Sequence, residues 1–332
     1  MNIRNTQECK RFAAQRLKNA PDAKRIVLIY SALAIGLSAL VTVVNYVLGL
    51  QINQMGGLSQ MGTRTILTTL QSVLPLVQSI FNLCLTVGFL AVTLRIARGQ
   101  YVSAQTLRLG FDRFWILLRA TVIQSFLYSS LIFLACYAGI MIYMMTPLSR
   151  DAMELLLPYL SDVSILDSAI VLEDAVYNQL TQTIWPAYLI CGVLLLILLP
   201  PVFYSYRMLH FVIIDKPGLG AFAALRESKR MMRGNRLALL KLDISLWWYY
   251  AAMVLASVIG YGDMILPLLG IRQPWSEDVG YFLFYGLYLA ATFAIYYLLL
   301  DRVNVTYALA YDSLKPEEQK TDGVVLGNIF QM

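Results

Sequence analysis

The sequence predicts an all-α, polytopic membrane protein with six transmembrane helices paired into three hairpins. Hydrophobic residues make up 58% of the 332-residue chain and charged residues only 14%, whereas soluble domains average about 45–50% and about 25%. Six apolar stretches are long enough to cross a bilayer, and Lys and Arg gather in alternate connections between them. Because lipid offers backbone amides no hydrogen-bond partner, each crossing must be helical.

The six expected spans follow one another along the chain. The first is too long for the apolar core of a signal peptide, and no small-residue cleavage site follows it. Pro200 and Pro201 should bend the fourth span, because each proline removes a backbone donor. The expected spans cover residues 25–50, 70–94, 114–145, 185–206, 242–259 and 281–300.

Basic residues set the expected topology. The segments before span one, between spans two and three, between spans four and five, and after span six, with their flanks, hold 23 of the 26 Lys and Arg residues. Because positive charge stays on the cytoplasmic side, we expect a multi-pass protein of the cell membrane with both termini cytoplasmic. Its parts are a basic head (1–25), a transmembrane domain (26–314) and a tail (315–332). The net charge of +6 is then a topology signal, and no nucleic-acid partner is expected.

The expected external segment, residues 148–183, contains six acidic residues and apolar residues at helical spacing. We expect two short amphipathic helices here, separated near Pro158. The segment could bind a partner protein or cap the helix bundle, and capping is the commoner case.

An amphipathic helix is expected over residues 220–235, between spans four and five. On a helical wheel its basic residues share one face, and alanine, leucine, serine and methionine share the other. This pattern is typical of a helix at the cytoplasmic interface whose cations bind anionic lipid headgroups. The alternative is a solvated face that only enforces topology. The candidate headgroup-binding residues are Arg226, Lys229, Arg230 and Arg233.

Three cytoplasmic segments resemble one another, and each precedes a span. They read "FAAQRLKN" from Phe12, "VSAQTLRLG" from Val102 and "FAALRESKRMMRGN" from Phe222. The similarity suggests a weak internal repeat of three helical hairpins, although alanine and leucine are common enough for chance to compete.

Polar residues form a stripe along each of the first two spans. The functional interpretation is a polar cavity for a headgroup or solute. The structural one is hydrogen bonding between helices, which membrane bundles use routinely and which we favour. Small-residue pairs, Ala32–Gly36 and Ala135–Gly139, also predict close helix packing. The stripes are Ser31, Ser38, Thr42 and Asn45 in span one, and Gln71, Gln78 and Asn82 in span two.

The sequence marks no catalytic, metal or cofactor site. It has one histidine and four scattered cysteines without a Cys-x-x-Cys pair, which supports neither a disulfide framework nor a zinc site. Phosphate-binding and hydrolase motifs are missing from it. His210 lies at the inner interface, off the helix face of Asp215.

The stretch from Tyr204 to Tyr250 resembles the core of an uncharacterised family of bacterial integral membrane proteins, domain of unknown function 975. The basic head and the "VTYALAYDSL" element near the end are also similar to it. One departure is Asp301-Arg302, which stands where the family has Pro-Tyr; another is Gly260-Tyr261-Gly262 in place of a Gly-Ile-Gly turn. The resemblance implies architecture and no reaction. Its motif residues here are Tyr204, Tyr206, Asp215, Pro217, Ala224, Leu225, Ser228, Met232, Gly234, Leu242, Ser245 and Trp248.

These observations favour a non-enzymatic membrane scaffold or accessory component that engages anionic lipid at the cytoplasmic face or an unidentified protein partner. A transporter or permease-like subunit is the first alternative, with a path lined by the stripes of spans one and two. A lipid-modifying enzyme is the second, and it would need His210, Asp215, Asp243 and Ser245 in one pocket.

Overall fold

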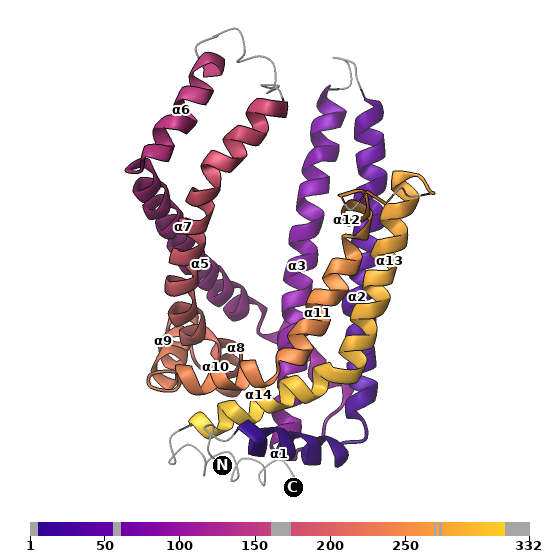
Figure 1. Ribbon diagram of the computed structural model, residues 1–332. Helices are drawn as coiled ribbons and strands as arrows, with labels where there is room; N and C mark the ends of the chain where they lie inside the picture. The colour runs from indigo at the N-terminus through magenta and orange to yellow at the C-terminus, as the bar shows by residue number, and fades with distance from the viewer. Residues whose placement is uncertain (1–5, 56–60, 161–173, 269, 272–273, 316–332) are drawn as a thin grey trace. The chain divides into compact units, whose positions relative to one another are not determined.

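The structure, a computed structural model, describes residues 6–55, 61–160, 174–268, 270–271 and 274–315 (Figure 1). Those residues form helices and no strands, as the sequence predicts. The chain divides into two compact units. Unit 1 comprises residues 1–120 and 208–332, and unit 2 comprises residues 121–207.

Unit 1 contains most of the helices, and α5 passes from it into unit 2. Its elements are α1 (Thr6–Lys18), α2 (Ala23–Gln54), α3 (Met61–Ala97), the 3-10 helix η2 (Ala104–Arg108), α4 (Leu109–Asp112), the start of α5 (Phe114–Met144), α8 (Leu209–Asp215), α9 (Ala221–Met231), α10 (Arg236–Ser245), α11 (Trp247–Gly260), α12 (Gly262–Leu268), α13 (Glu277–Ile295), the π-helix η4 (Tyr296–Leu300) and α14 (Asp301–Leu314).

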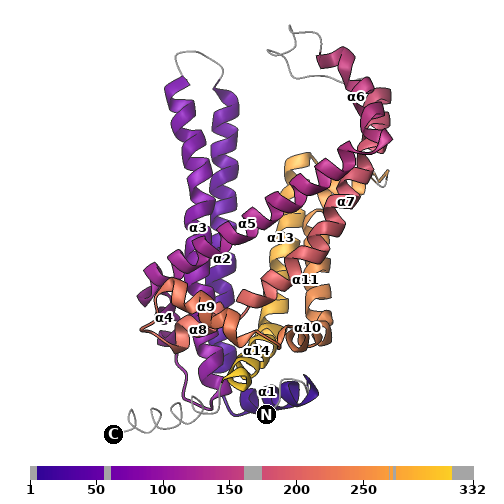
Figure 2. The same cartoon turned by 90° about the vertical axis from the view of Figure 1, so that its left-hand side faces the viewer.

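The core of unit 1 forms around the carboxyl-terminal half of α3. Residues from Cys84 to Ala97 are largely buried, and α1, η2, α4, α8 and α14 all pack against this segment. Together with α9 and α10, these elements form what we call the amphipathic layer (Figures 1 and 2). Of the three similar segments, two are α-helices, α1 and α9, whereas the second folds into the short η2 and α4.

Two glycines allow α3 to touch η2 and α4 backbone to backbone. A Cβ at Gly88 would lie 2.0 Å from the Leu107 carbonyl oxygen, and one at Gly110 would lie 1.9 Å from the Cys84 carbonyl oxygen. Since no side chain can fit at these distances, glycine is required at both positions.

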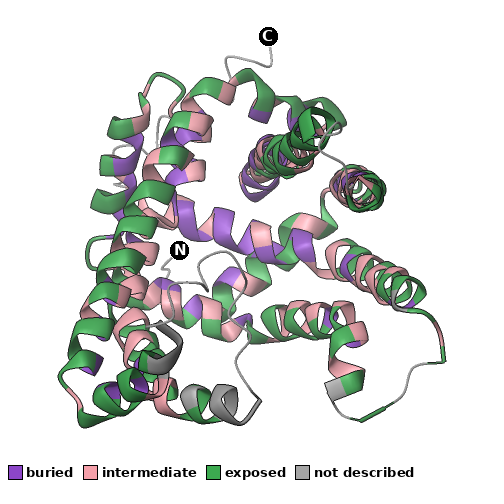
Figure 3. Cartoon of the chain, turned by 90° about the horizontal axis from the view of Figure 1, so that it is seen from above, coloured by how far each residue is buried: buried purple, intermediate pink, exposed green. Residues whose placement is uncertain are grey.

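The apolar helices carry large exposed hydrophobic side chains. Five helices are long and apolar enough to cross a membrane, or six if the bent pair α10 and α11 forms one span. Leu196 is 75% exposed, and Phe126 and Phe133 are each 72% exposed, so these surfaces suit lipid rather than water. Exposed residues line much of the helical surface in Figure 3. The chain therefore has the features of a multi-pass membrane protein.

The segment predicted as the fifth span, 242–259, contains a break between two helices. The chain bends by 62° between α10 and α11, at Leu246. The Ser245 hydroxyl donates a hydrogen bond to the Leu242 carbonyl, and the Lys10 ammonium donates to the Ser245 carbonyl. These contacts satisfy carbonyls at the end of α10 and stabilise the break.

The sixth span runs on without interruption through a π-helix into α14. Lys24 of α2 donates to the Tyr297 carbonyl at 2.7 Å and forms an ion pair of 2.8 Å with Asp301. A π-helix shifts the backbone hydrogen-bond pattern by one residue and leaves carbonyls in need of donors. Lys24 supplies such a donor, and its ion pair with Asp301 helps to hold the ammonium in place.

Unit 2 contains the remainder of α5, α6 (Pro147–Leu160) and α7 (Asp174–Tyr206). The first predicted helix appears as α6, which ends at Leu160, close to the split expected near Pro158. Residues 161–173 lie outside the described part of the chain, so the second predicted helix there is untested. α7 remains one helix through Pro200 and Pro201.

The two predicted small-residue pairs behave differently. In unit 2, Ala135 is fully buried, and a Cβ at Gly139 would lie 2.4 Å from the sulfur of Cys191. This pair therefore permits the close approach of α5 and α7. In unit 1, a Cβ at Gly36 would meet nothing within 4 Å, so the Ala32–Gly36 pair does not mark a helix contact here.

Gly110→Ala should destabilise unit 1, because the new methyl group would overlap the α3 backbone. We expect the free energy of unfolding to fall by about 2–3 kcal/mol, measured by thermal or denaturant unfolding in detergent. Gly36→Ala is the matched control and should leave stability unchanged or raise it by up to about 1 kcal/mol. Equal effects of the two substitutions would contradict the backbone contact.

Candidate functional site

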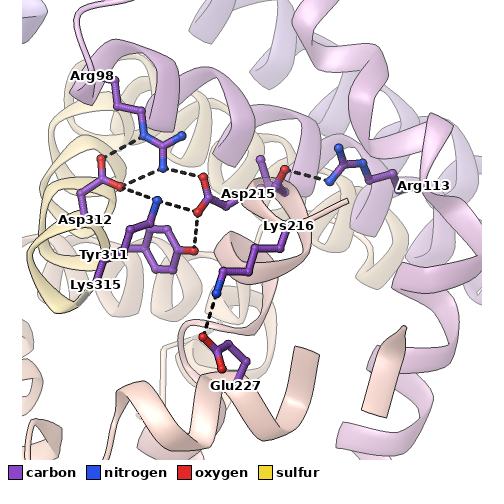
Figure 4. A network of polar contacts seen from close by, with 9 residues as sticks. Arg98, Arg113, Asp215, Lys216, Glu227, Tyr311, Asp312 and Lys315 are labelled. Atoms are coloured by element: carbon purple, nitrogen blue, oxygen red, sulfur yellow. Dashed lines mark hydrogen bonds and ion pairs between the residues drawn. The ribbon is translucent and has the colours of Figure 1, made fainter. Parts of the chain in front are cut away.

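An ionic cluster joins three helix ends in the amphipathic layer (Figure 4). Arg98, directly after α3, contacts Asp215 at the end of α8 at 2.7 Å and Asp312 in the last turn of α14 at 2.8 Å. Its Nε also donates to Asp312 at 3.1 Å, which makes the Arg98–Asp312 contact bidentate. One guanidinium therefore connects helices from three distant parts of the sequence.

Tyr311 of α14 and Lys315, which directly follows that helix, complete the cluster. Lys315 forms an ion pair of 2.5 Å with Asp215, and its side chain is only 9% exposed. The Tyr311 hydroxyl donates a hydrogen bond of 3.0 Å to Asp215 Oδ2, the oxygen that Lys315 also contacts. The Tyr311 ring stacks on Phe211 of α8. Polar and apolar contacts thus hold α8 and α14 together.

Helix dipoles explain why cations gather here. The carboxyl termini of α3, α8 and α14 all end at the cluster, and each carries partial negative charge. Arg113 donates to the carbonyls of Ile213 and Ile214 at the end of α8, the latter at 2.8 Å. Arg98, Arg113 and Lys315 offset the helix ends and the two carboxylates, so the cluster is close to neutral.

The cluster is suited to holding helices in place rather than to moving protons. Burial alone would lower the pKa of Arg98, but the ion pairs with Asp312 and Asp215 outweigh it and raise the pKa. The guanidinium therefore stays charged at any physiological pH. Arg98 thus attracts Asp312 and Asp215 and fixes their orientation, and its own charge does not change with pH.

The predicted amphipathic helix appears as α9, which is shorter than the expected 220–235. Gly220 precedes it in an extended conformation, and Gly234 follows with φ +84°. Ala224, Leu225, Ser228, Met231 and Met232 are buried, whereas the four candidate cations, Arg226, Lys229, Arg230 and Arg233, are exposed. The apolar face thus packs against unit 1 itself.

One acidic residue of α9 anchors the helix and occupies part of its basic face. Glu227 forms ion pairs with Lys216 at 2.9 Å and with Arg230 at 2.8 Å. Burial would raise the pKa of Glu227, but these two cations outweigh it and lower the pKa. Arg230 is therefore partly committed to Glu227, while the other three cations extend from the exposed face.

The polar stripe of span one contacts α13 as well as α3. The Thr42 hydroxyl lies 2.7 Å from the Tyr285 hydroxyl, and the Ser38 hydroxyl lies 3.4 Å from it. Ser31 is buried and donates to the Val27 carbonyl of its own helix. These three residues make hydrogen bonds between or within helices.

The stripe of span two turns toward α2. The side-chain amide of Gln71 donates a hydrogen bond of 3.3 Å to the backbone carbonyl of Asn45, and Gln78 is half-buried. The side-chain oxygens of Asn45 and Asn82 are buried without a hydrogen-bond partner among the described residues. The stripes therefore combine satisfied contacts with unsatisfied ones.

The residues that a lipid-modifying enzyme would need take part in separate interactions. Asp215 belongs to the ionic cluster, and Asp243 accepts a hydrogen bond from Tyr307. The Ser245 hydroxyl is bonded to its own helix. Within the described ranges, no group of three or more His, Cys, Asp and Glu side chains could hold a metal ion.

Sequence reasoning did not find the ionic cluster. Arg98 is separated from Asp312 by 214 residues, and no short motif joins them. Asp215 stood out only as a residue of the resembled motif, and Arg98 only as a charged residue at the end of an apolar helix, which the topology rule already explained. The cluster depends on three helix ends meeting, and only the tertiary structure shows that they do.

Replacing Arg98 by methionine should destabilise unit 1, because two carboxylates would remain in a partly buried site with one fewer cation. We expect the free energy of unfolding to fall by about 2–4 kcal/mol. Arg98→Lys keeps the charge but loses the bidentate geometry, so its loss should be smaller. Denaturant unfolding in detergent measures both. An Arg98→Met protein as stable as the original would show that the cluster is dispensable.

Comparison with known proteins places the chain in one family. No curated protein and no solved structure matches it. A family described as protein of unknown function (DUF975) matches residues 1–304, which include α1, all the apolar helices and Arg98 and Asp215 of the cluster. The match covers most of the chain, and the chain belongs to this family, DUF975.

Proposed function

We propose that this protein is a non-enzymatic scaffold or accessory component of the cell membrane whose amphipathic layer binds anionic lipid headgroups at the cytoplasmic face. The observation that carries the proposal is the orientation of α9. Its apolar face is buried in unit 1, and its basic face is exposed. A helix anchored in this way presents cations at a fixed position beside the membrane spans.

Charge and aromatic residues support this placement of α9. The exposed face begins with Phe222, which is 72% exposed, one helical turn before Arg226. A phenylalanine beside cations suits the boundary between acyl chains and phosphates better than bulk water. Each cation near an anionic surface contributes about 1 kcal/mol. The alternative, a solvated basic face that only enforces topology, would gain nothing from this phenylalanine.

The position of the chain ends supports a cytoplasmic amphipathic layer. α1 packs against α14, so the first and last described helices lie at the same end of unit 1. Most of the chain's basic residues precede, follow or connect these layer helices. Under the positive-inside rule this end faces the cytoplasm, and the segment around α6 lies outside.

A transporter remains the second candidate, and the unsatisfied amide oxygens of Asn45 and Asn82 favour it. Against it, Ser38 and Thr42 are bonded to Tyr285 across the α2–α13 contact. Such bonds use the stripe for packing. A solute path would need these hydroxyls to be accessible to water.

The lipid proposal predicts a loss of anionic lipid when cations outside the Glu227 ion pair are removed. Arg226→Gln with Arg233→Gln should weaken binding by about 2 kcal/mol, roughly thirtyfold. Native mass spectrometry with phosphatidylglycerol measures the retained lipid. Arg64→Gln with Arg150→Gln removes the same charge from exposed positions outside the amphipathic layer and is the control. Equal lipid retention in the two double variants would reduce α9 to a topology signal.

The topology is tested by labelling single cysteines in intact cells with an impermeant thiol reagent. Lys229 is exposed on α9 and Glu154 is exposed on α6, so a cysteine at either position can react with reagent on its side of the membrane. Ser228 of α9 is unsuitable for labelling because it is buried. In a cysteine-free background we expect Glu154→Cys to react and Lys229→Cys to react only after permeabilisation. The reverse pattern would invert the proposed orientation.

A further inference from the structure

A groove with a volume of about 450 Å³ opens between α2 and α13 in unit 1. Tyr46 of α2 lines one side, and four residues from the first two turns of α13 line the other. The groove is mostly apolar, with a carboxylate among its lining groups. The four α13 residues are Asp278, Val279, Phe282 and Leu283.

Tyr46 and Asp278 form the polar end of the groove. Their side chains share a hydrogen bond, and the Tyr46 hydroxyl is the donor because an ionised carboxylate can only accept. Asp278 is exposed, and a carboxylate has about four acceptor positions, so it can accept further N–H groups. The Tyr46 ring meets the Phe282 ring edge-on, with centroids 4.7 Å apart. A carboxylate beside aromatic rings suits an ammonium group, which both attract.

The polar end of the groove lies about one bilayer thickness from the amphipathic layer. Lys24 marks the layer on α2 through its ion pair with Asp301 at the start of α14. From Lys24 to Tyr46, α2 rises by about 33 Å, at about 1.5 Å per residue. The hydrocarbon core of a bilayer is about 30 Å thick. When the amphipathic layer lies at one membrane interface, Tyr46 and Asp278 therefore lie at headgroup level in the opposite leaflet.

An apolar strip continues from the groove along α13. Val279 is 55% exposed and Leu283 is 44% exposed, and a Cβ at Gly286, one turn further on, would meet nothing within 4 Å. These three residues share one face of the helix. The opposite face is packed against α11, where a Cβ at Gly260 would lie 3.1 Å from Tyr288. The strip is thus an exposed apolar surface on a membrane span, which suits an acyl chain.

We propose that this groove binds a membrane lipid with a primary ammonium headgroup, such as phosphatidylethanolamine. The ammonium donates hydrogen bonds to the Asp278 carboxylate beside the rings of Tyr46 and Phe282, and an acyl chain lies along the apolar strip of α13. A primary ammonium fits better than a quaternary one, because only the primary group has N–H donors for the carboxylate. Asp278 repels a headgroup with net negative charge, so the selectivity is opposite to that proposed for α9. Neither proposal depends on the other.

Native mass spectrometry with phosphatidylethanolamine and phosphatidylglycerol of the same acyl chains tests the headgroup. Asp278→Asn removes the charge at equal size and keeps an acceptor for Tyr46. We expect the affinity for phosphatidylethanolamine to fall about tenfold, as for one lost charge-assisted hydrogen bond, and the affinity for phosphatidylglycerol to stay unchanged. Asp263→Asn removes a carboxylate of α12 outside the groove and should change neither. Unchanged phosphatidylethanolamine affinity in Asp278→Asn would overturn the proposal.

Photo-crosslinking locates the lipid and distinguishes it from a soluble amine. Phosphatidylethanolamine with a diazirine on one acyl chain should label α13 mainly between Val279 and Gly286, and Asp278→Asn should lose most of this label. Excess glycerophosphoethanolamine, which is the headgroup without acyl chains, should leave the label in place. Displacement by this headgroup would overturn the proposal in favour of a soluble amine as the ligand. Label spread evenly along α2 and α13 would also overturn it, because the lipid would then have no defined site.

Discussion

Direct backbone contact between α3 and the η2–α4 segment is the constraint on which unit 1 depends. Gly88 and Gly110 bring the two chains so close that no side chain fits between them. This contact buries the carboxyl-terminal half of α3 and fixes where that helix ends. Arg98 follows directly, so its position depends on the same contact. The cluster with Asp215 and Asp312 can form only because α3 ends at that depth in the amphipathic layer.

The amphipathic layer combines two ways of stabilising helix ends. Arg113, Lys10 and Lys24 donate hydrogen bonds to carbonyls at a helix end, at the bend between α10 and α11, and at the π-helix. Arg98 and Lys315 instead pair with carboxylates near helix ends. At the helix ends, both arrangements place positive charge where helix dipoles are negative, whereas Lys24 supplies a donor inside a continuous helix. Several of the basic residues that indicate topology therefore also have a structural role, whereas Arg226, Lys229 and Arg233 on the exposed face of α9 are those proposed to bind lipid.

The polar groups in the interior of unit 1 are uncharged, unlike those of the amphipathic layer. Between α2, α3 and α13 the polar groups are hydroxyls and amides, and some are bonded directly across helices, as at Thr42 and Tyr285. Others, such as Asn82 and Thr292, have a buried side-chain oxygen without a hydrogen-bond partner among the described residues. Direct bonds stabilise helix packing. A scaffold needs only such packing contacts, whereas a transporter would need a polar path that continues to both membrane surfaces.

The sequence by itself determined the helical class, the approximate apolar segments and the two faces of α9, because these depend on composition and on periodicity along one helix. It also identified the family through residues near Asp215 and Ser228. Only the tertiary structure decided the bend at Leu246, the π-helix beside Asp301 and the meeting of Arg98 with Asp215 and Asp312. Each of these depends on groups far apart in the chain, such as Lys10 with Ser245 and Lys24 with Asp301. Local patterns describe which face of a helix is apolar, but they contain no information on which other helix that face meets.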